Sequence, residues 1–141
     1  MGNIYNNYKY ILVCGCVWLS IQLFKFTYDS IKYKKPMWKR LSGAGGMPSS
    51  HSAVTCVLAV MIGRFEGFNT AAFAIAGLFA FITMYDAAGV RRAVGKHAKV
   101  LNDILRDNKL SNEKKLQELT GHTPIQVAAG ALIGIIVGFL V

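Results

Sequence analysis

The sequence predicts an all-α integral membrane protein: a bundle of about four transmembrane helices, with a cytosolic helical arm between the third and the fourth. The 141-residue chain is 53% apolar and only 16% charged, whereas a soluble domain carries about 25% charged residues. Long uncharged segments alternate with basic polar segments. The length leaves no room for separate catalytic and anchoring domains, so we expect residues 1–141 to form a single membrane domain.

Three segments are predicted to span the bilayer on length and composition. Residues 8–28 have an apolar centre with aromatic residues at both ends, which is typical of a helix crossing two interfaces. The segment lacks the basic start and small-residue cleavage site of a signal peptide, so we expect it to be retained. Residues 67–86 and 123–141 each contain 19 consecutive uncharged residues, enough to cross about 30 Å of hydrocarbon.

The fourth predicted span, residues 49–68, has a weaker signal. The segment from Ser52 to Gly63 contains only 12 uncharged residues before Arg64 and Glu66 follow. Such a length also suits a re-entrant or buried helix. If Arg64 and Glu66 extend to the far interface, the segment is long enough to span. The G-x-x-x-G spacing within 123–141 indicates close helix packing.

The polar segments, residues 29–48 and 87–122, determine the predicted orientation. Together with their edges they contain 14 of the 16 Lys and Arg residues, so both are expected in the cytoplasm and both termini outside. Nucleic-acid binding would not require the Lys and Arg residues to be concentrated in alternate segments between apolar stretches. Apolar residues at helical spacing make 87–122 the helical arm, with a second short helix expected from Ser111 to about Gly121. A bacterial plasma membrane is the expected location.

Four spans place particular polar residues at one membrane face. The second and fourth helices would begin there, with His51 and His122 at their N-termini, and the first and third would end there, bringing Lys25 and Asp86. Helix N-termini offer free N–H groups and a positive partial charge to a bound phosphate. This combination predicts a phosphoryl-transfer site that faces the cytoplasm.

Three strings in this order resemble a known family. They are "GGMPSSHSA", "MYDAAGVRRAVGKHAKVLN" and "GHTPIQVAAGALIGIIVG". They are similar to the type 2 phosphatidic acid phosphatases, the superfamily of lipid phosphatases and vanadium haloperoxidases, and in particular to its divergent, short branch in bacteria and plants. The resemblance covers residues 23–141.

The resemblance implies a mechanism and assigns residues to it. His122 matches the nucleophile that forms a phosphohistidine, and His51 matches the general acid for the leaving oxygen. Ser49 and Ser50, with nearby amides, would hold phosphoryl oxygens. The implied activity is hydrolysis of a lipid phosphate monoester or pyrophosphate without metal or cofactor. The expected partners are the lipid phosphate substrate and membrane lipids, with no nucleic acid; a homo-oligomer is left open.

The chain departs from the family pattern where cationic and acidic groups are expected. The lysine-x6-arginine-proline element is absent. Lys25, Lys39 and Arg40 are its approximate substitutes, and of these Lys25 and Arg40 are the candidates for phosphate binding. The acid four residues after the nucleophile is replaced by Gln126, which can orient an imidazole by hydrogen bonding but brings no charge.

Two further departures concern the helical arm. Arg91 and Arg92 are the candidates to replace the family's missing arginine, and Asp86 to replace its acid. His97 is a rival nucleophile, because its spacing from Arg91 also fits the family, although no apolar span follows it. Two other functions stay open: a non-catalytic lipid-binding or scaffold protein that keeps the phosphate-binding fold, and a small transporter. Cytoplasmic orientation favours inner-leaflet substrates such as phosphatidate or phosphatidylglycerophosphate.

Overall fold

The protein is all-α in the computed structural model, which describes residues 4–38, 45–107, 115–118 and 120–141, with only the backbone for 4–7. None of these residues forms a β-strand, so the predicted fold class is confirmed. The helices are α1 (Ile4–Tyr33), α2 (Ser50–Glu66), α3 (Ala71–Ala88), α4 (Val90–Asp107) and α5 (Pro124–Leu140).

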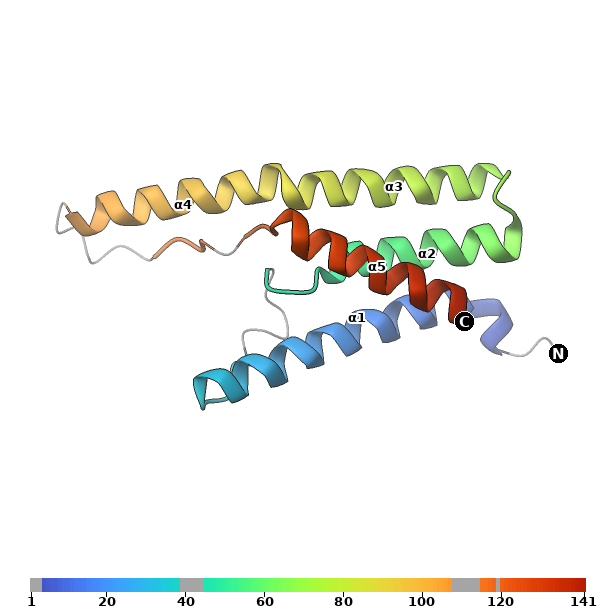
Figure 1. Cartoon of the computed structure of the whole chain (residues 1–141), viewed down its shortest axis with the longest axis horizontal. Coiled ribbons are helices and arrows are strands. Elements are labelled where there is room, and N and C mark those ends of the chain that lie inside the picture. The colour runs from blue at the N-terminus through green and yellow to red at the C-terminus, as the bar shows by residue number, and fades with distance from the viewer. Residues whose placement is uncertain (1–3, 39–44, 108–114, 119) are drawn as a thin grey trace.

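The helices run in alternating directions, except for one straight continuation (Figure 1). Helices α2 and α5 run in the same direction, so their N-termini lie at the same end, while α1 and α3 run the opposite way. Helix α4 continues the line of α3 beyond Gly89 and projects past the N-termini of α2 and α5. This projection is the helical arm that the sequence predicts between the third and fourth apolar segments.

Helices α2 and α5 pack closely because α5 presents a row of glycines to α2. A Cβ atom at Gly134 would lie 2.2 Å from the carbonyl oxygen of Ala53, and one at Gly130 would lie 2.3 Å from that of Ser49. No side chain fits in such a gap. The G-x-x-x-G spacing therefore marks the α2–α5 interface, and the buried core continues from α2 to α1 through Val17, Ile21, Ala53, Val57 and Met61.

Two helical stretches are long and apolar enough to cross a bilayer, residues 8–33 and 71–107, the second combining α3 with α4. Helix α5 is apolar but shorter, and α2, at 17 residues, is only about 25 Å long. Large apolar side chains on α3 are exposed, among them Ile75, Leu78, Phe79, Phe81 and Ile82. An apolar surface of this extent suits a hydrocarbon environment.

Charged residues at the end of α2 are held by neighbouring helices. Arg64 donates a hydrogen bond from Nη1 to the carbonyl oxygen of Gly138 at 2.8 Å. Glu66 accepts one from the Tyr10 hydroxyl at 2.6 Å. Both side chains are exposed, as expected for charged groups that extend toward an interface.

The expected short helix from Ser111 to Gly121 is wrong for its described part. Residues 115–118 and 120–122 are not helical. The segment runs back alongside α4, and its backbone groups form hydrogen bonds with a side chain of α4. The Asn102 side chain accepts a hydrogen bond from the Leu116 N–H and donates one to its carbonyl, both at 2.9 Å. A Cβ at Gly95 would lie 2.4 Å from the Glu118 carbonyl oxygen, so this segment lies directly on α4.

Candidate functional site

His122 lies just before α5 and is held by groups from α3 and α5. Its backbone N–H donates to the carbonyl oxygen of Ala87 at 3.0 Å, near the end of α3. Its ring Nδ1 lies 3.3 Å from Oε1 of Gln126, one turn into α5. The residue is only 3% exposed, so both the position and the orientation of the imidazole are restricted.

Gln126 has a second contact that defines which atom faces His122. Its Oε1 accepts a hydrogen bond from the Thr123 N–H at 3.0 Å, and its own N–H donates to Thr123 Oγ1 at 3.4 Å. Together they form a capping box at the start of α5. A backbone N–H only donates, so the amide oxygen faces this way and His122 Nδ1 carries the hydrogen. The string T-P-I-Q is the sequence signature of this capping box. The family pattern alone does not reveal this role of Gln126.

The turn before α2 contains two glycines, one of which, Gly46, contacts His122. Gly45 and Gly46 have φ values of 95° and 81°, in the left-handed region that favours glycine. The Gly46 backbone forms a hydrogen bond with the His122 side chain. The glycines beside P-S-S-H therefore allow a close backbone approach, and the group approached in this structure is the imidazole.

Ser49 joins the two helix N-termini. It is fully buried, and its hydroxyl accepts hydrogen bonds from the Ser52 N–H at 3.3 Å and the Ser52 hydroxyl at 2.9 Å, which makes it the N-cap of α2. Its N–H donates to the Gln126 carbonyl oxygen at 3.1 Å. The Ser49 hydroxyl is thus occupied by capping, whereas Ser50, also buried, begins the helix itself.

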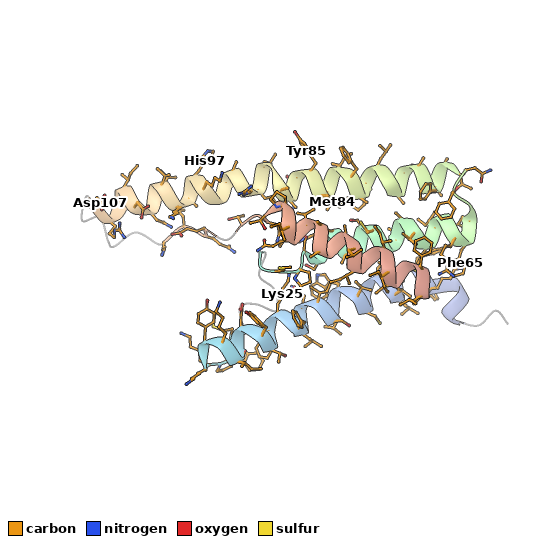
Figure 2. All side chains as sticks on the ribbon, in the orientation of Figure 1. Lys25, Phe65, Met84, Tyr85, His97 and Asp107 are labelled. Atoms are coloured by element: carbon orange, nitrogen blue, oxygen red, sulfur yellow. The ribbon has the colours of Figure 1, made fainter. Side chains whose placement is uncertain are left out.

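His51 and Lys25 lie within electrostatic reach of His122. His51 is exposed at the start of α2, and its charge acts on His122. Lys25 is only 5% exposed, and its charge acts on both histidines. Figure 2 shows Lys25 on the side of α1 that faces α2 and α5. The structure therefore brings together a buried lysine on α1, a histidine at the start of α2 and a histidine just before α5.

Asp86 and Arg91 form an ion pair at the α3–α4 junction. Arg91 Nε lies 2.6 Å from Asp86 Oδ2, and both side chains are partly exposed. Both charges also act on His51. Arg92 lies against the return segment instead, since a Cβ at Gly121 would be 2.3 Å from the Arg92 backbone nitrogen. Of the two arginines, Arg91 is the one whose charge reaches a histidine here.

The pKa of His122 is lowered from its ordinary value of 6.5. Burial is the main cause, because it disfavours the charged imidazolium, and the positive charges of Lys25 and His51 act in the same direction. The hydrogen bonds with Gln126 and the Gly46 backbone oppose the shift. The net result favours a neutral imidazole at neutral pH.

The remaining candidate residues lie elsewhere. Arg40 falls outside the described residues. His97 is exposed on α4, and Figure 2 shows it on the arm, away from Lys25. Across the described parts of the chain, no three His, Cys, Asp or Glu side chains gather as a metal site would need.

The comparisons with known proteins identify the family of the chain. Residues 6–137 match the sequence profile described as the Divergent PAP2 family. The chain is 40% identical to the "Uncharacterized membrane protein YuiD" of Bacillus subtilis (strain 168), with 82% of each chain covered. No solved structure matches the chain. Since the profile spans nearly the whole length, the chain is a membrane protein that belongs to the divergent PAP2 family.

Proposed function

We propose that the protein is a lipid-phosphate phosphatase whose nucleophile is Nε2 of His122. The observation that carries this proposal is the Nδ1–Gln126 contact of a buried histidine at a helix N-terminus. Gln126 Oε1 and the Gly46 backbone both accept from the ring. With the single hydrogen of the neutral ring on Nδ1, the lone pair lies on Nε2, and the mechanism requires the phosphate to replace any contact of Gly46 with that nitrogen. The lowered pKa keeps this nitrogen unprotonated at neutral pH. A neutral, oriented imidazole is what nucleophilic attack on phosphorus requires.

The phosphate would bind between the N-termini of α2 and α5. The first N–H groups of a helix have no partner within it, and Ser49 already satisfies that of Ser52. The amides of Ser50 and His51 would then donate to phosphoryl oxygens, with Ser50 Oγ beside them. Lys25 and Arg91 supply positive charge, so the phosphoryl oxygens can be neutralised by cationic side chains and helix N-termini.

The reaction would proceed in two steps. His122 Nε2 attacks phosphorus, the bond from phosphorus to the lipid oxygen breaks, and His51 donates a proton to the leaving oxygen. Water then attacks the phosphohistidine while His51 takes a proton from it, which releases inorganic phosphate and restores both histidines. Gln126 orients the ring but adds no negative charge to stabilise the developing imidazolium, so we expect slower turnover than with a carboxylate at this position.

The proposed topology has four spans, α1, α2, α3 and α5, with the site at the cytoplasmic face of a bacterial plasma membrane. The C-terminal end of α1, which includes Lys32, and the basic helix α4 lie at the end where α2 and α5 begin, as the positive-inside rule requires. Arg64, hydrogen-bonded to α5, and Glu66, hydrogen-bonded to α1, would mark the opposite interface. Helices α2 and α5 are somewhat shorter than the hydrocarbon thickness, which local bilayer thinning accommodates.

A second candidate function is lipid-phosphate binding without hydrolysis. It is favoured by Gln126 in place of an acid, and by the ion pair of Asp86 with Arg91, which already engages the carboxylate that would replace that acid. Binding alone requires the cationic site and the helix N-termini but neither acid nor nucleophile.

Phosphate release separates the two functions. Purified protein in phosphatidylcholine vesicles would be given phosphatidate, phosphatidylglycerophosphate or a polyisoprenyl pyrophosphate. We expect release by wild type, loss in His122→Asn, and no change in His97→Asn, the matched control on the exposed arm. Equal release by wild type and His122→Asn would refute the mechanism. Binding without release across the panel would establish the second function.

A further inference from the structure

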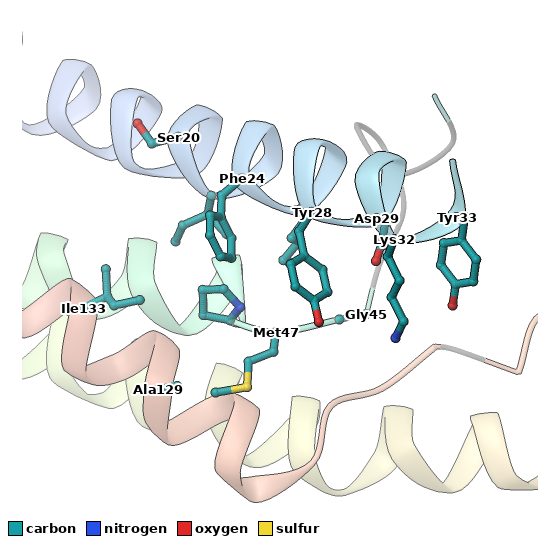
Figure 3. A pocket seen from close by; sticks show the side chains of 14 residues that line it. Ser20, Phe24, Tyr28, Asp29, Lys32, Tyr33, Gly45, Met47, Ala129 and Ile133 are labelled. Carbon is teal, nitrogen blue, oxygen red and sulfur yellow. The ribbon is translucent and has the colours of Figure 1, made fainter. Parts of the chain in front are cut away.

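A groove between α1 and α5 adjoins the histidine site. Helix α1 packs on α2, and α5 packs on α2 and α3, which leaves space between α1 and α5 (Figure 3). One cavity of about 710 Å³ and a second of about 570 Å³ lie there and share Ser20, Ile21 and Ile133 in their walls. The two cavities therefore form one groove along both helices.

The groove is apolar for most of its length and charged at one end. Its far part is lined by Leu12, Val17, Val137 and other apolar residues. Its near part includes Lys25 and Lys32, and Figure 3 shows Tyr28, Asp29 and Lys32 on the side of α1 that faces the turn at Gly45. This gradient complements a molecule with an anionic head and a hydrocarbon chain.

Two residues connect the groove to the histidines. Lys25 lines the groove and acts electrostatically on His51 and His122. Gly46 also lines it and is hydrogen-bonded to the His122 ring. A phosphate at the histidines would therefore lie at the charged end of the groove.

We propose that this groove binds one hydrocarbon chain of the lipid phosphate, extended along α1. The proposal rests on the proposed function for the position of the phosphate. Thirteen helical positions separate Lys25 from Leu12, so the groove continues for about 20 Å beyond the lysine. This exceeds the depth of one leaflet, about half of the 30 Å hydrocarbon core. Helix α1 thus acts as the chain-binding helix, and a water-soluble phosphate ester would leave the groove empty.

Cys16 is a native reporter of occupancy. It is exposed and lines the far part of the groove, while Cys56 is buried outside it. In vesicles, alkylation of Cys16 by a membrane-permeant maleimide would be followed by mass spectrometry. We expect about tenfold slower alkylation when a long-chain lipid phosphate is present at ten times its Kd. Inorganic phosphate should give no protection. Separate phosphatidate and polyisoprenyl phosphate arms identify which kind of chain binds.

Variants of α5 test the location. Ile133→Trp and Ala129→Phe fill the groove and should abolish the protection of Cys16, while Leu132→Trp, on an exposed face of the same helix, should preserve it. Protection that persists in both groove variants would overturn the proposal, as would equal alkylation with and without lipid. A Cys16–Cys16 crosslink between copies, unaffected by lipid, would show that a second copy fills the groove and would also overturn it.

The same measurement in His122→Asn keeps this proposal separate from the proposed function. Protection of Cys16 depends on binding alone, so it should persist when turnover is removed. Protection without phosphate release from wild type would sustain the chain-binding groove and refute the catalytic mechanism. Release without protection would sustain the mechanism and refute the groove.

Discussion

The α2–α5 interface predicts a large effect from a single methyl group. In Gly134→Ala, the new Cβ would lie 2.2 Å from the Ala53 carbonyl oxygen and 2.9 Å from Cys56 Cβ, whereas ordinary contacts begin at 3.4 Å. Neither neighbour is the end of a flexible side chain. The helices must therefore separate by about 1 Å, because a packed interior offers no free volume.

The expected cost has two components. Overpacking of this kind costs about 1–3 kcal/mol, while replacing glycine by alanine within a helix gains about 0.5–1 kcal/mol. We expect a net loss of stability and a Tm lower by several degrees. Because His51 is on α2 and His122 precedes α5, the same separation would also move the two histidines apart. A displacement of about 1 Å can reduce a rate about 100-fold.

The assay compares thermal unfolding in detergent and phosphate release for Gly134→Ala and for Gly77→Ala. A Cβ at Gly77 has no heavy atom within 4 Å, so this control gains the helix propensity without the clash and should be at least as stable as wild type. If Gly134→Ala matches Gly77→Ala in Tm and in rate, the close α2–α5 contact does not position the histidines.

Four other predictions follow, three from the site and one from the segment that lies along α4. The acid limb of the pH–rate profile should lie below pH 6.5, since the pKa of His122 is lowered and the neutral ring is the nucleophile. Lys25→Met should raise the pKa of His122, because it removes a nearby positive charge. NMR titration of the ring measures this shift, and an unchanged or lower pKa would contradict the prediction. Gln126→Glu should also raise it, and should increase turnover if stabilising the imidazolium limits the rate; an unchanged rate would exclude that limit. Asn102→Ala removes both hydrogen bonds to Leu116 and should increase trypsin cleavage at Lys115 without changing Tm by more than a few degrees, with Asn69→Ala as an exposed control.

Local chemistry made the helices and several of their boundaries predictable. Long apolar segments form helices in a bilayer because every backbone polar group must be satisfied internally. Thr70 and Gly67 mark the start of α3 and the end of α2, with Thr70 accepting a hydrogen bond from Phe73 N and Gly67 adopting a φ of 112°. Helix α1 continues to Tyr33, beyond the span predicted over residues 8–28; its last turns contain charged residues that carry no apolar signal.

The return segment shows where local pattern fails. Ser111 and the charged residues after it suggested a second helix, yet residues 115–118 extend along α4. The competing interaction is the Asn102 amide, which satisfies both backbone groups of Leu116 from 14 residues away. No window of sequence around Leu116 contains that information.

The sequence by itself determined that this is a helical membrane protein with long apolar segments, and which polar residues stand at helix N-termini. Only the tertiary structure decided what those residues contact. The Ser49 hydroxyl caps α2, Gly46 reaches the ring of His122, Arg91 pairs with Asp86, and Lys25 is buried beside an apolar groove. The physical reason is that helix formation and bilayer insertion depend on composition over about 20 residues, whereas burial, pKa and ion pairing depend on atoms that only packing brings together.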